Sequence, residues 1–405
     1  MAIRKWMRFV QRKHRIPRIL LFLVCVMAGF ILRQQIFLLN KSYTTTTRNL
    51  DLQDISKVNP ISCQPVTNVM FLKTHKTASS TVLNILYRFI ENHNLTVALP
   101  IEKMHIFHYP QPFKAEYVEG FPDIWQKYNV MCNHLKFELR EVQKVMPNNT
   151  LYFSIMRNPV SLLESSYIYF RFLPSFNKTR TLDQFLSSPH SYYNPHEPYH
   201  MLIKNTMWYD FGYDNNAEDR ENYVYSVLEE IEQRFQLILI TEYFDESMVL
   251  LKNTLCWELE DVVYFKLNIR SQDTIQTLTQ ESKERAKQWC SLDWKLYQHF
   301  NRTFWKRIQE TIGLEKMKQE VEILQARQKE LMQVCLQEGK AIDKSKIKDS
   351  GLQPAQAGNA NILGYNLKLG LNNKTINVCR RMIIPEHIYT NRMREYQLFQ
   401  KPKII

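Results

Sequence analysis

The chain has 405 residues, of which 44% are hydrophobic, 23% charged and 12% aromatic. These values are typical of folded proteins, so they exclude a disordered or fibrous chain and allow a sizeable core. The formal net charge is +13, but eight Lys and Arg and no acidic residue lie in the first 33 positions. The remaining 372 residues carry about +5, which is too little to indicate nucleic-acid binding.

The first 39 residues are typical of a membrane anchor. A basic head over residues 1–18 precedes fourteen uncharged apolar residues, Ile19 to Leu32, and residues 36–39 extend this run beyond Arg33. About 20 residues span a bilayer, and Arg33 can extend its charged end to a headgroup. A cleaved signal peptide is the alternative, but its A-x-A cleavage pattern is missing. We predict a single transmembrane helix over 19–39, a cytosolic tail over 1–18 and a luminal stem over 40–66.

Two further patterns agree with a luminal location. Six N-x-[ST] sequons are present, at Asn40, Asn94, Asn148, Asn177, Asn301 and Asn373. Six cysteines outside the membrane segment allow up to three disulfides: Cys63, Cys132, Cys256, Cys290, Cys335 and Cys379. Cys132 and Cys256 lie in apolar stretches, so free buried thiols are the alternative there. No cysteine–histidine cluster indicates a metal site.

Strand-like apolar runs alternate with helical patterns from residue 68 onward. Asn68–Leu72 precedes a polar loop and a helical pattern over 82–89, and the same arrangement returns at Leu151–Met156. Gln236–Ile240 precedes a helix from about Asp245 to Leu255. Such alternation predicts an α/β fold with a central parallel sheet flanked by helices, whose ligands bind at the carboxyl ends of the strands.

A later segment, Leu314–Leu336, has the pattern of an amphipathic helix. It is too short for a coiled coil, so we expect it to pack on the domain. We divide the luminal part into a main domain over 67–310 and a C-terminal helix and tail over 311–405 that pack on it.

Residues 73–81 (KTHKTASST) form the most informative segment, a polar loop between a strand and a helix. Backbone N–H groups at the start of such a helix converge on one spot and bind anions. Ala78 is small enough to let an anion reach the backbone, as glycine does in a Walker loop, and Lys76 supplies a cation. An ordinary helix cap is the alternative. Further donors are the hydroxyls of Thr77, Ser79, Ser80 and Thr81.

The second strand–helix unit carries a comparable pair. Arg157 follows the strand, Pro159 suits the first turn of the next helix, and Ser165 lies two helical turns further on. Arginine offers a planar fork of donors for a phosphate. Together with the first loop, this pair predicts a ligand that carries two separate phosphates.

These motifs resemble those of a known family. KTHKTASST and RNPVSLLESS resemble the 5′- and 3′-phosphate sites of Golgi sulfotransferases, and the surrounding text resembles the galactose 3-O-sulfotransferases. The resemblance covers about Thr67 to Arg381, in five separated blocks: 71–89, 131–137, 153–170, 240–268 and 362–367. It implies a P-loop-like sulfotransferase fold and the sulfuryl donor 3′-phosphoadenosine 5′-phosphosulfate, with no metal required.

The resemblance also implies site residues. Lys76 would neutralise charge on the bridging oxygen, and Arg157 and Ser165 would bind the 3′-phosphate. Sulfotransferases commonly have Asp after that arginine, whereas this chain has Asn158, which leaves an orienting role of this position open. The 5′-phosphate would be held by Lys73, Lys76, Thr77, Ala78, Ser79, Ser80 and Thr81.

Sulfuryl transfer to a sugar hydroxyl needs a base for the proton. His134 follows the apolar run 130–132 and can lie at a strand end, as the base does in related sulfotransferases. His75 lies within the phosphate loop, where an anion favours the charged imidazole. We therefore expect His134 to be the base and His75 to stabilise charge. His105, His108, Trp208 or Tyr209 could contact the acceptor, and Lys266, Asn268 and Arg270 could close over the nucleotide.

The resemblance implies direct in-line transfer to the 3-hydroxyl of terminal β-galactose on glycoprotein and mucin glycans, by a Golgi enzyme that is membrane-anchored and compatible with a homo-oligomer. Galactosylceramide is the alternative acceptor. A metal-dependent glycosyltransferase is disfavoured because no D-x-D motif occurs. A kinase is disfavoured because Asp210-Phe211-Gly212 stands without a glycine-rich loop or HRD. A non-enzymatic glycan-binding protein explains the anchor but not two phosphate-type loops.

Overall fold

The computed structural model describes residues 63–124 and 126–400. Five strands form one parallel sheet in the order β2-β3-β1-β4-β5. The strands are β1 (Val69–Leu72), β2 (Val97–Ala98), β3 (Val130–Met131), β4 (Leu151–Met156) and β5 (Leu237–Ile240). The predicted α/β class and parallel sheet are thus confirmed.

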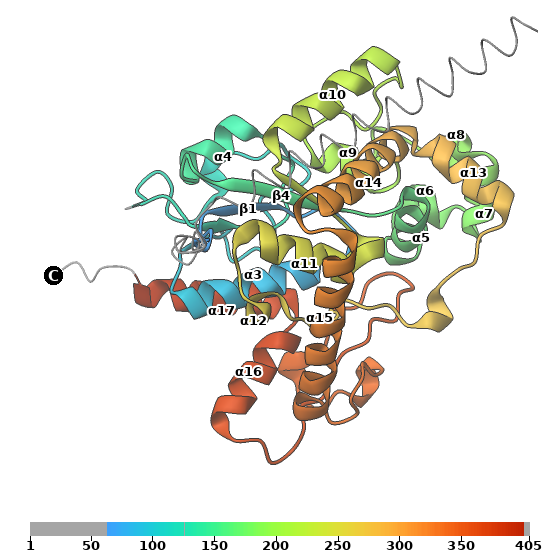
Figure 1. The fold of residues 1–405 in the computed structure, drawn as a ribbon. Coiled ribbons are helices and arrows are strands. Elements are labelled where there is room, and N and C mark those ends of the chain that lie inside the picture. Colours follow the sequence, from blue (N-terminus) through green and yellow to red (C-terminus); the bar gives the residue numbers. More distant parts are fainter. Residues whose placement is uncertain (1–62, 125, 401–405) are drawn as a thin grey trace, which may run out of the picture. The chain divides into compact units, whose positions relative to one another are not determined.

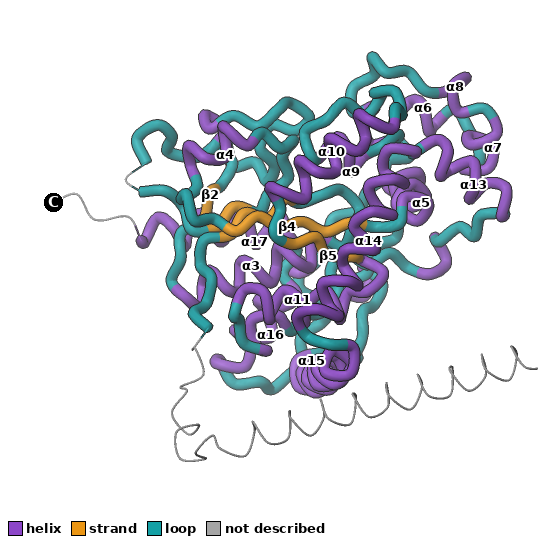
Figure 2. Tube along the Cα trace, turned by 45° about the horizontal axis from the view of Figure 1, so that its top comes forward, coloured by secondary structure: helices purple, strands orange, loops and turns teal. Residues whose placement is uncertain are grey.

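Helices flank the sheet on both faces. Figures 1 and 2 show α3 and α11 on one side of the strands and α4 and α10 on the other. The helices of the described chain are α3 (Ser79–His93), α4 (Leu139–Val145), α5 (Pro159–Tyr169), α6 (Pro174–Asn177), α7 (Leu182–Ser187), α8 (Pro189–Tyr192), α9 (Thr206–Asp210), α10 (Glu221–Arg234), α11 (Phe244–Leu255), α12 (Leu259–Val262), α13 (Gln280–Trp289), α14 (Ser291–Thr311), α15 (Leu314–Cys335), α16 (Asn373–Ile383) and α17 (Glu386–Gln400).

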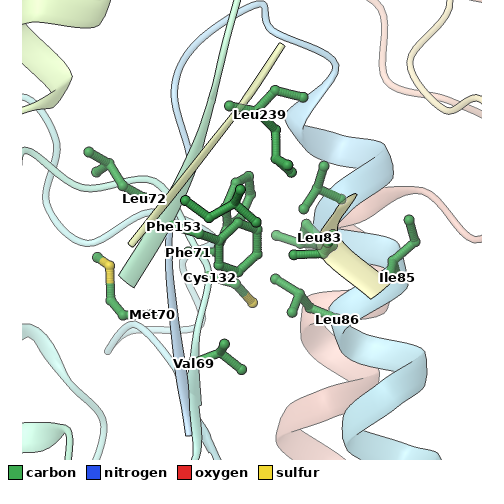
Figure 3. Packing of buried hydrophobic residues seen from close by; sticks show 14 of the residues in the cluster. Val69, Met70, Phe71, Leu72, Leu83, Ile85, Leu86, Cys132, Phe153 and Leu239 are labelled. Carbon is green, nitrogen blue, oxygen red and sulfur yellow. The ribbon is translucent and has the colours of Figure 1, made fainter. Parts of the chain in front are cut away.

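The core lies between the sheet and its helices. All four residues of β1 are fully buried, because helices cover both faces, and the strand therefore reads as an unbroken apolar run. Phe71 of β1 stacks on Phe153 of β4 with ring centroids 4.9 Å apart, and Leu83 and Leu86 of α3 pack beside them (Figure 3). This packing fixes the end of β1 from which the polar loop 73–78 departs.

The C-terminal segments pack on the same core. Lys252 of α11 forms an ion pair with Glu320 of α15 at 2.7 Å, so the predicted packing of this amphipathic helix on the domain is confirmed. Helix α17 lies against α3, where the Tyr87 and Thr390 hydroxyls are 3.1 Å apart and Arg392 pairs with Glu91 at 2.8 Å.

The cysteines divide into bonded and free groups. Cys335 of α15 is bonded to Cys379 of α16, and Cys63 and Cys256 are disulfide-bonded as well. Cys132 and Cys290 are buried thiols. A free thiol is thus confirmed for Cys132, whereas the same alternative is wrong for Cys256.

The predicted membrane anchor over 19–39 lies outside the described residues. Among residues 63–124 and 126–400, no helix has the length and apolar character needed to cross a bilayer.

Candidate active site

The loop between β1 and α3 adopts a backbone suited to an anion. Lys76 and Ala78 both lie in the left-handed region, with φ of 58° and 60°, and Ala78 is the N-cap of α3. Left-handed residues that alternate with right-handed ones turn successive N–H groups into one concavity, which binds anions. The first N–H groups of α3 add to it, because no residue of the helix precedes them to accept their hydrogen bonds. The predicted glycine-like role of Ala78 agrees with this geometry.

The hydroxyl groups of this loop mainly hold the loop itself. Ser79 Oγ donates to the Thr74 carbonyl oxygen at 2.7 Å, and the Thr77 hydroxyl lies 2.8 Å from that of Thr74.

Two further hydroxyls bond to distant parts of the chain. Ser80 Oγ donates to Glu386 Oε2 at 2.7 Å, and Thr81 Oγ1 accepts from the Leu267 N–H at 3.0 Å. Backbone N–H groups and the lysines are therefore better placed as anion donors than the predicted hydroxyls.

The second predicted loop lies beside the first. Arg157, directly after β4, donates from Nη1 to the Lys76 carbonyl oxygen at 3.0 Å. Asn158 caps α5 by accepting from the Val160 N–H at 3.0 Å, so Asn serves here as a helix cap in place of Asp. Ser165 is buried two turns into α5. The structure thus brings Arg157 to Lys76.

Positive charge accumulates around Lys76. Its Nζ lies 3.4 Å from the centroid of the Tyr169 ring. Burial, together with the positive charges of Arg157, Arg270 and Lys73, holds the pKa of Lys76 well below its usual value. Arg270 forms an ion pair with Glu164, and its Nη1 is buried without a hydrogen-bond partner in the described chain. An anion bound here would relieve the repulsion and supply the missing acceptor.

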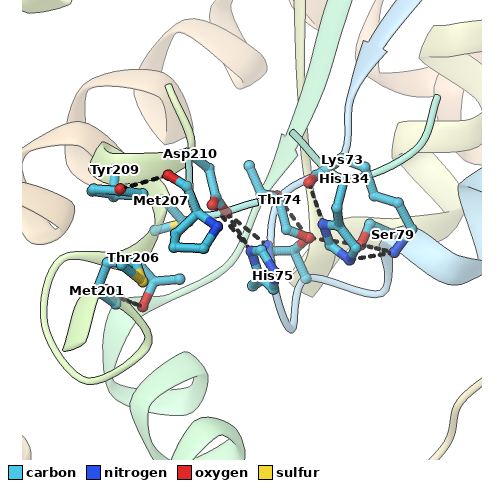
Figure 4. A network of polar contacts seen from close by, with 12 residues as sticks. Lys73, Thr74, His75, Ser79, His134, Met201, Thr206, Met207, Tyr209 and Asp210 are labelled. Carbon is cyan, nitrogen blue, oxygen red and sulfur yellow. Dashed lines mark hydrogen bonds and ion pairs between the residues drawn. The ribbon is translucent and has the colours of Figure 1, made fainter. Parts of the chain in front are cut away.

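His75 is oriented by a buried carboxylate (Figure 4). Its Nδ1 lies 3.0 Å from Asp210 Oδ1, and its backbone N–H donates to Asp210 Oδ2 at 2.9 Å. Asp210 is the last residue of α9 and fully buried. Asp293 holds the start of α9 by accepting from the Met207 and Trp208 N–H groups. No hydrogen bond to His75 Nε2 occurs among the described residues, so this nitrogen is left to accept a proton.

His134 is engaged at both ring nitrogens. Its Nδ1 donates to the Lys73 carbonyl oxygen at 2.7 Å, and its Nε2 accepts from Lys73 Nζ at 2.8 Å. The ring stacks on that of His75 with centroids 4.0 Å apart. Burial and the neighbouring His75 and Lys73 hold the pKa of His134 well below its usual value, so the ring is neutral. This neutral imidazole has no free acceptor.

Three residues of the site escaped prediction. Tyr169 lies beneath Lys76, Asp210 pairs with His75, and Glu386 of α17 forms an ion pair with Lys73 at 3.1 Å. Asp210 belongs to the Asp-Phe-Gly triplet, which is no kinase motif yet does carry a site residue. Nothing local in the sequence relates Asp210 to His75, because the helix α9 that carries it is too short to show a period.

The predicted acceptor contacts differ in exposure. Trp208 is fully buried, so its expected contact with an acceptor is wrong. His105 is exposed, and His108 stacks on Tyr117 with ring centroids 4.3 Å apart.

Tyr209 is half-buried, with Lys136 Nζ 4.0 Å from its ring centroid. Aromatic rings lead from His75 to Tyr109 at 4.5 Å and on to Tyr209 at 5.9 Å.

The arrangement can hold an anion beside an oriented imidazole. Cations and backbone N–H groups face one spot at the end of β1, and His75 lies in the same loop. Transfer of a negatively charged group to a hydroxyl needs these two features, charge stabilisation and a base. Within residues 63–124 and 126–400, no group of three or more metal-ligating side chains is present.

Comparison with known proteins identifies the family. A galactose-3-O-sulfotransferase family profile matches residues 5–397. The chain is 54% identical to galactose-3-O-sulfotransferase 2 of Sus scrofa, over 84% of this chain and 86% of the relative, and 52% identical to that of Homo sapiens, over 84% and 85%. It is 42% identical to galactosylceramide sulfotransferase of Homo sapiens, over 81% and 78%. The chain is therefore a sulfotransferase that belongs to the galactose-3-O-sulfotransferase family.

Proposed function

We propose that this chain transfers the sulfuryl group of 3′-phosphoadenosine 5′-phosphosulfate to the 3-hydroxyl of terminal β-galactose on glycoprotein and mucin-type glycans. The observation that carries the proposal is the pairing of two strand–helix loops through Arg157 Nη1 and the Lys76 carbonyl oxygen at 3.0 Å. Two linked cationic loops suit a donor that carries two separate phosphates.

The site residues fit such a donor. Within the described part of the chain the buried Nη1 of Arg270 has no acceptor, and Lys73, Lys76 and Arg157 add three further positive charges nearby. The loop N–H groups would hold the 5′-phosphate, with the charge of the buried Lys73 close by, and Arg157 with Ser165 would hold the 3′-phosphate. The donor supplies an activated sulfuryl group, whose sulfur–oxygen bond to the 5′-phosphate breaks during transfer.

The protein would stabilise the charge that this cleavage leaves. Lys76 lies on the loop that faces the 5′-phosphate, so its ammonium group suits the leaving oxygen. Its lowered pKa follows from burial and from the neighbouring cations, and a bound anion offsets both effects. Arg157 orients the Lys76 backbone at the same time.

The geometry favours His75 as the base, which reverses the roles expected from the sequence. His75 Nδ1 is held by Asp210, so its Nε2 accepts the proton of the galactose 3-hydroxyl as the oxygen attacks sulfur. The resulting imidazolium is stabilised by the Asp210 carboxylate. His134 Nε2 is already hydrogen-bonded to Lys73, so His134 acts as a neutral partner that supports the His75 ring.

The relatives support a galactose acceptor and differ in its carrier. The galactose-3-O-sulfotransferase 2 sequences are 52–54% identical to this chain, and the galactosylceramide sulfotransferase of Homo sapiens is 42% identical. The relatives with the higher identity are named for galactose without a ceramide, which is the ground on which we place glycans before a lipid as acceptor. We further propose that the enzyme is a single-pass Golgi membrane protein, anchored through residues 19–39 with its catalytic domain in the lumen.

The proposal is tested with the full-length chain and radiolabelled donor. The acceptors are N-acetyllactosamine, the Galβ1-3GalNAc disaccharide and galactosylceramide, with Lys76→Ala as the inactive control. Label at the galactose 3-hydroxyl of the two glycans, and little on the lipid, is the expected result. Preferential labelling of galactosylceramide would move the proposal to the lipid acceptor, and failure to bind the donor would overturn it.

A further inference from the structure

Glu386 brings a carboxylate from the far end of the chain into the phosphate loop. It is the first residue of α17. Its Oε2 accepts from Ser80 Oγ at 2.7 Å and pairs with Lys73 Nζ at 3.1 Å. Lys73 begins the loop that is suited to an anion and Ser80 lies in the first turn of α3, so a negative charge lies within an otherwise cationic site.

This carboxylate stays ionised. Burial alone would raise the pKa of Glu386, but the charge of Lys73 and the hydrogen bonds from Ser80 and Lys73 outweigh burial and lower it. An ionised carboxylate repels an anionic donor and weakens its binding. A role in donor binding therefore does not account for Glu386, and its effect must come through Lys73.

Lys73 has three donors and three neighbours that can accept from it. They are Glu386 Oε2 at 3.1 Å, His134 Nε2 at 2.8 Å and Ser79 Oγ at 3.3 Å. Lys73 is almost completely buried, with 2% of its side chain exposed, so water cannot replace a lost acceptor easily. The carboxylate is the charged member of the three and fixes the direction of the ammonium group.

We propose that Glu386 is a positioning residue, which holds Lys73 against His134 Nε2 and thereby keeps His134 neutral beside His75. Because Lys73 occupies His134 Nε2, the proton of the acceptor hydroxyl is left to His75 alone, whose ring stacks on that of His134 at 4.0 Å. Helix α17 is on this account part of the active site and not only a cover for α3. The inference rests on the proposed function, because it assumes an anionic donor and a base in the loop.

The test separates positioning from donor binding by measuring both in the full-length Glu386→Gln variant. Adenosine 3′,5′-bisphosphate, titrated by calorimetry, reports donor-site affinity, and labelled donor reports turnover. We expect kcat to fall about 10- to 100-fold, the range for a displaced catalytic group, while the nucleotide binds equally well or several-fold more tightly. Tighter binding with slower turnover is a combination that a purely structural role does not produce.

Two further variants complete the design. Arg392→Gln breaks another α17 ion pair, with Glu91 on α3, outside the loop, and should leave kcat and nucleotide affinity within about twofold of the unmodified chain. Glu386→Asp keeps the charge on a shorter stem, and we expect it to recover part of kcat. It also serves as the test should the Gln variant fail to fold.

The outcomes are distinct. If the unmodified chain does not bind the nucleotide, the proposed function fails. If it binds the nucleotide but Glu386→Gln, or its Asp counterpart, loses affinity with unchanged kcat, Glu386 is a binding or structural residue and the inference is overturned. If Glu386→Gln and Arg392→Gln lower kcat equally, the inference is likewise overturned, because α17 would then act through its packing alone.

Discussion

The two stacked imidazoles of the site differ in what occupies their nitrogens. His75 has a carboxylate at Nδ1, whereas His134 has a backbone carbonyl at Nδ1 and an ammonium group at Nε2. A carboxylate stabilises the imidazolium that forms when a base takes up a proton, and an ammonium group opposes it. The same residue type in two neighbouring positions is therefore suited to two different tasks.

Asp210→Asn tests the first of these tasks. The amide keeps the shape of the carboxylate but can donate to His75 Nδ1, which favours the wrong tautomer and removes the charge that stabilises the imidazolium. We expect kcat to fall about 100-fold or more, with little change in the KM for the donor. The measurement is steady-state kinetics with labelled donor.

The matched control is Asp214→Asn, which alters an exposed carboxylate four residues further along and should leave kcat within about twofold. His134→Gln provides the counter-test. If His134→Gln abolishes turnover while Asp210→Asn is nearly as active as the unmodified chain, the base is His134 and the expectation from the sequence was right.

Lys76 carries a prediction about pH. Its pKa lies well below the usual lysine value because burial and three neighbouring cations disfavour the charged form. Only the charged form attracts an anion, so nucleotide affinity should be full at lower pH and decline as pH rises through this lowered pKa. The decline should begin at a pH well below that at which an exposed lysine loses its proton, as measured by calorimetric titration across the pH range.

Lys76→Arg is the control, because a guanidinium group stays charged throughout this range. The variant should bind the nucleotide with a nearly flat pH dependence, even where its turnover is reduced. A decline that persists in Lys76→Arg would assign the pH dependence to another group of the site.

At the scale of elements, long apolar runs were sufficient to predict the main strands. β1, β4 and β5 are unbroken runs buried on both faces, and each lies where its run predicts it. β2 was not predicted, since its two residues, Val97–Ala98, are too few to show a period. Short helices such as α9 were missed for a related reason, because five residues give little more than one turn.

The site was predictable only where its chemistry is local. The loop 73–81 and the pair Arg157 and Ser165 carry their pattern in a few consecutive residues. Asp210 and Glu386 lie 135 and 306 positions from the loop residues they contact, so only the tertiary fold relates them to it. The expected donor hydroxyls were assigned from residue type alone, which does not reveal that Ser79 already donates to the Thr74 carbonyl oxygen and Ser80 to Glu386.

The disulfide between α15 and α16 is the element-scale prediction. Cys335 and Cys379 are 44 residues apart in sequence, and closing a loop of this length in the unfolded chain removes about 4 kcal/mol of conformational entropy. The Cys335→Ala/Cys379→Ala double variant should therefore lower the free energy of unfolding by about 4 kcal/mol, as measured by denaturant titration.

Cys290→Ala is the comparison, because it removes a buried sulfur atom that forms no bridge. The Cys290→Ala variant should lower the free energy of unfolding by about 1 kcal/mol. If the double variant lowers the free energy of unfolding by no more than Cys290→Ala does, then α15 and α16 are held together by their packing and not by the bridge.

At the scale of the whole molecule, the site is assembled from both ends of the catalytic chain. Lys73 follows the first strand and Glu386 begins the last helix, and they meet at 3.1 Å. The expected division between a catalytic domain over 67–310 and a tail over 311–405 therefore does not separate the site, since α17 contacts Lys73 and Ser80 through Glu386. Removing the tail should disturb the site as well as the packing.

The proposed topology makes a prediction about glycans. Asn148, Asn177 and Asn373 stand in N-x-[ST] sequons with exposed side chains, so a luminal catalytic domain presents them to the glycosylation machinery. Enzymatic removal of N-glycans should increase the electrophoretic mobility of the chain, and each Asn→Gln variant should account for one step of this shift. Asn92→Gln, an exposed asparagine outside any sequon, should change nothing.

Orientation is tested on the same chain in sealed microsomes. With residues 1–18 outside the vesicle, residues 19–39 in the membrane and residues 40–405 inside, added protease should remove an N-terminal tag and leave the remainder intact until detergent opens the vesicle. The basic head is what retains residues 1–18 on the cytosolic side, so replacing its seven Lys and Arg by Gln should weaken this orientation. A chain that carries no glycan and is digested along its whole length would place the catalytic domain in the cytosol and overturn the proposed topology, while the sulfotransferase chemistry of the site would still stand.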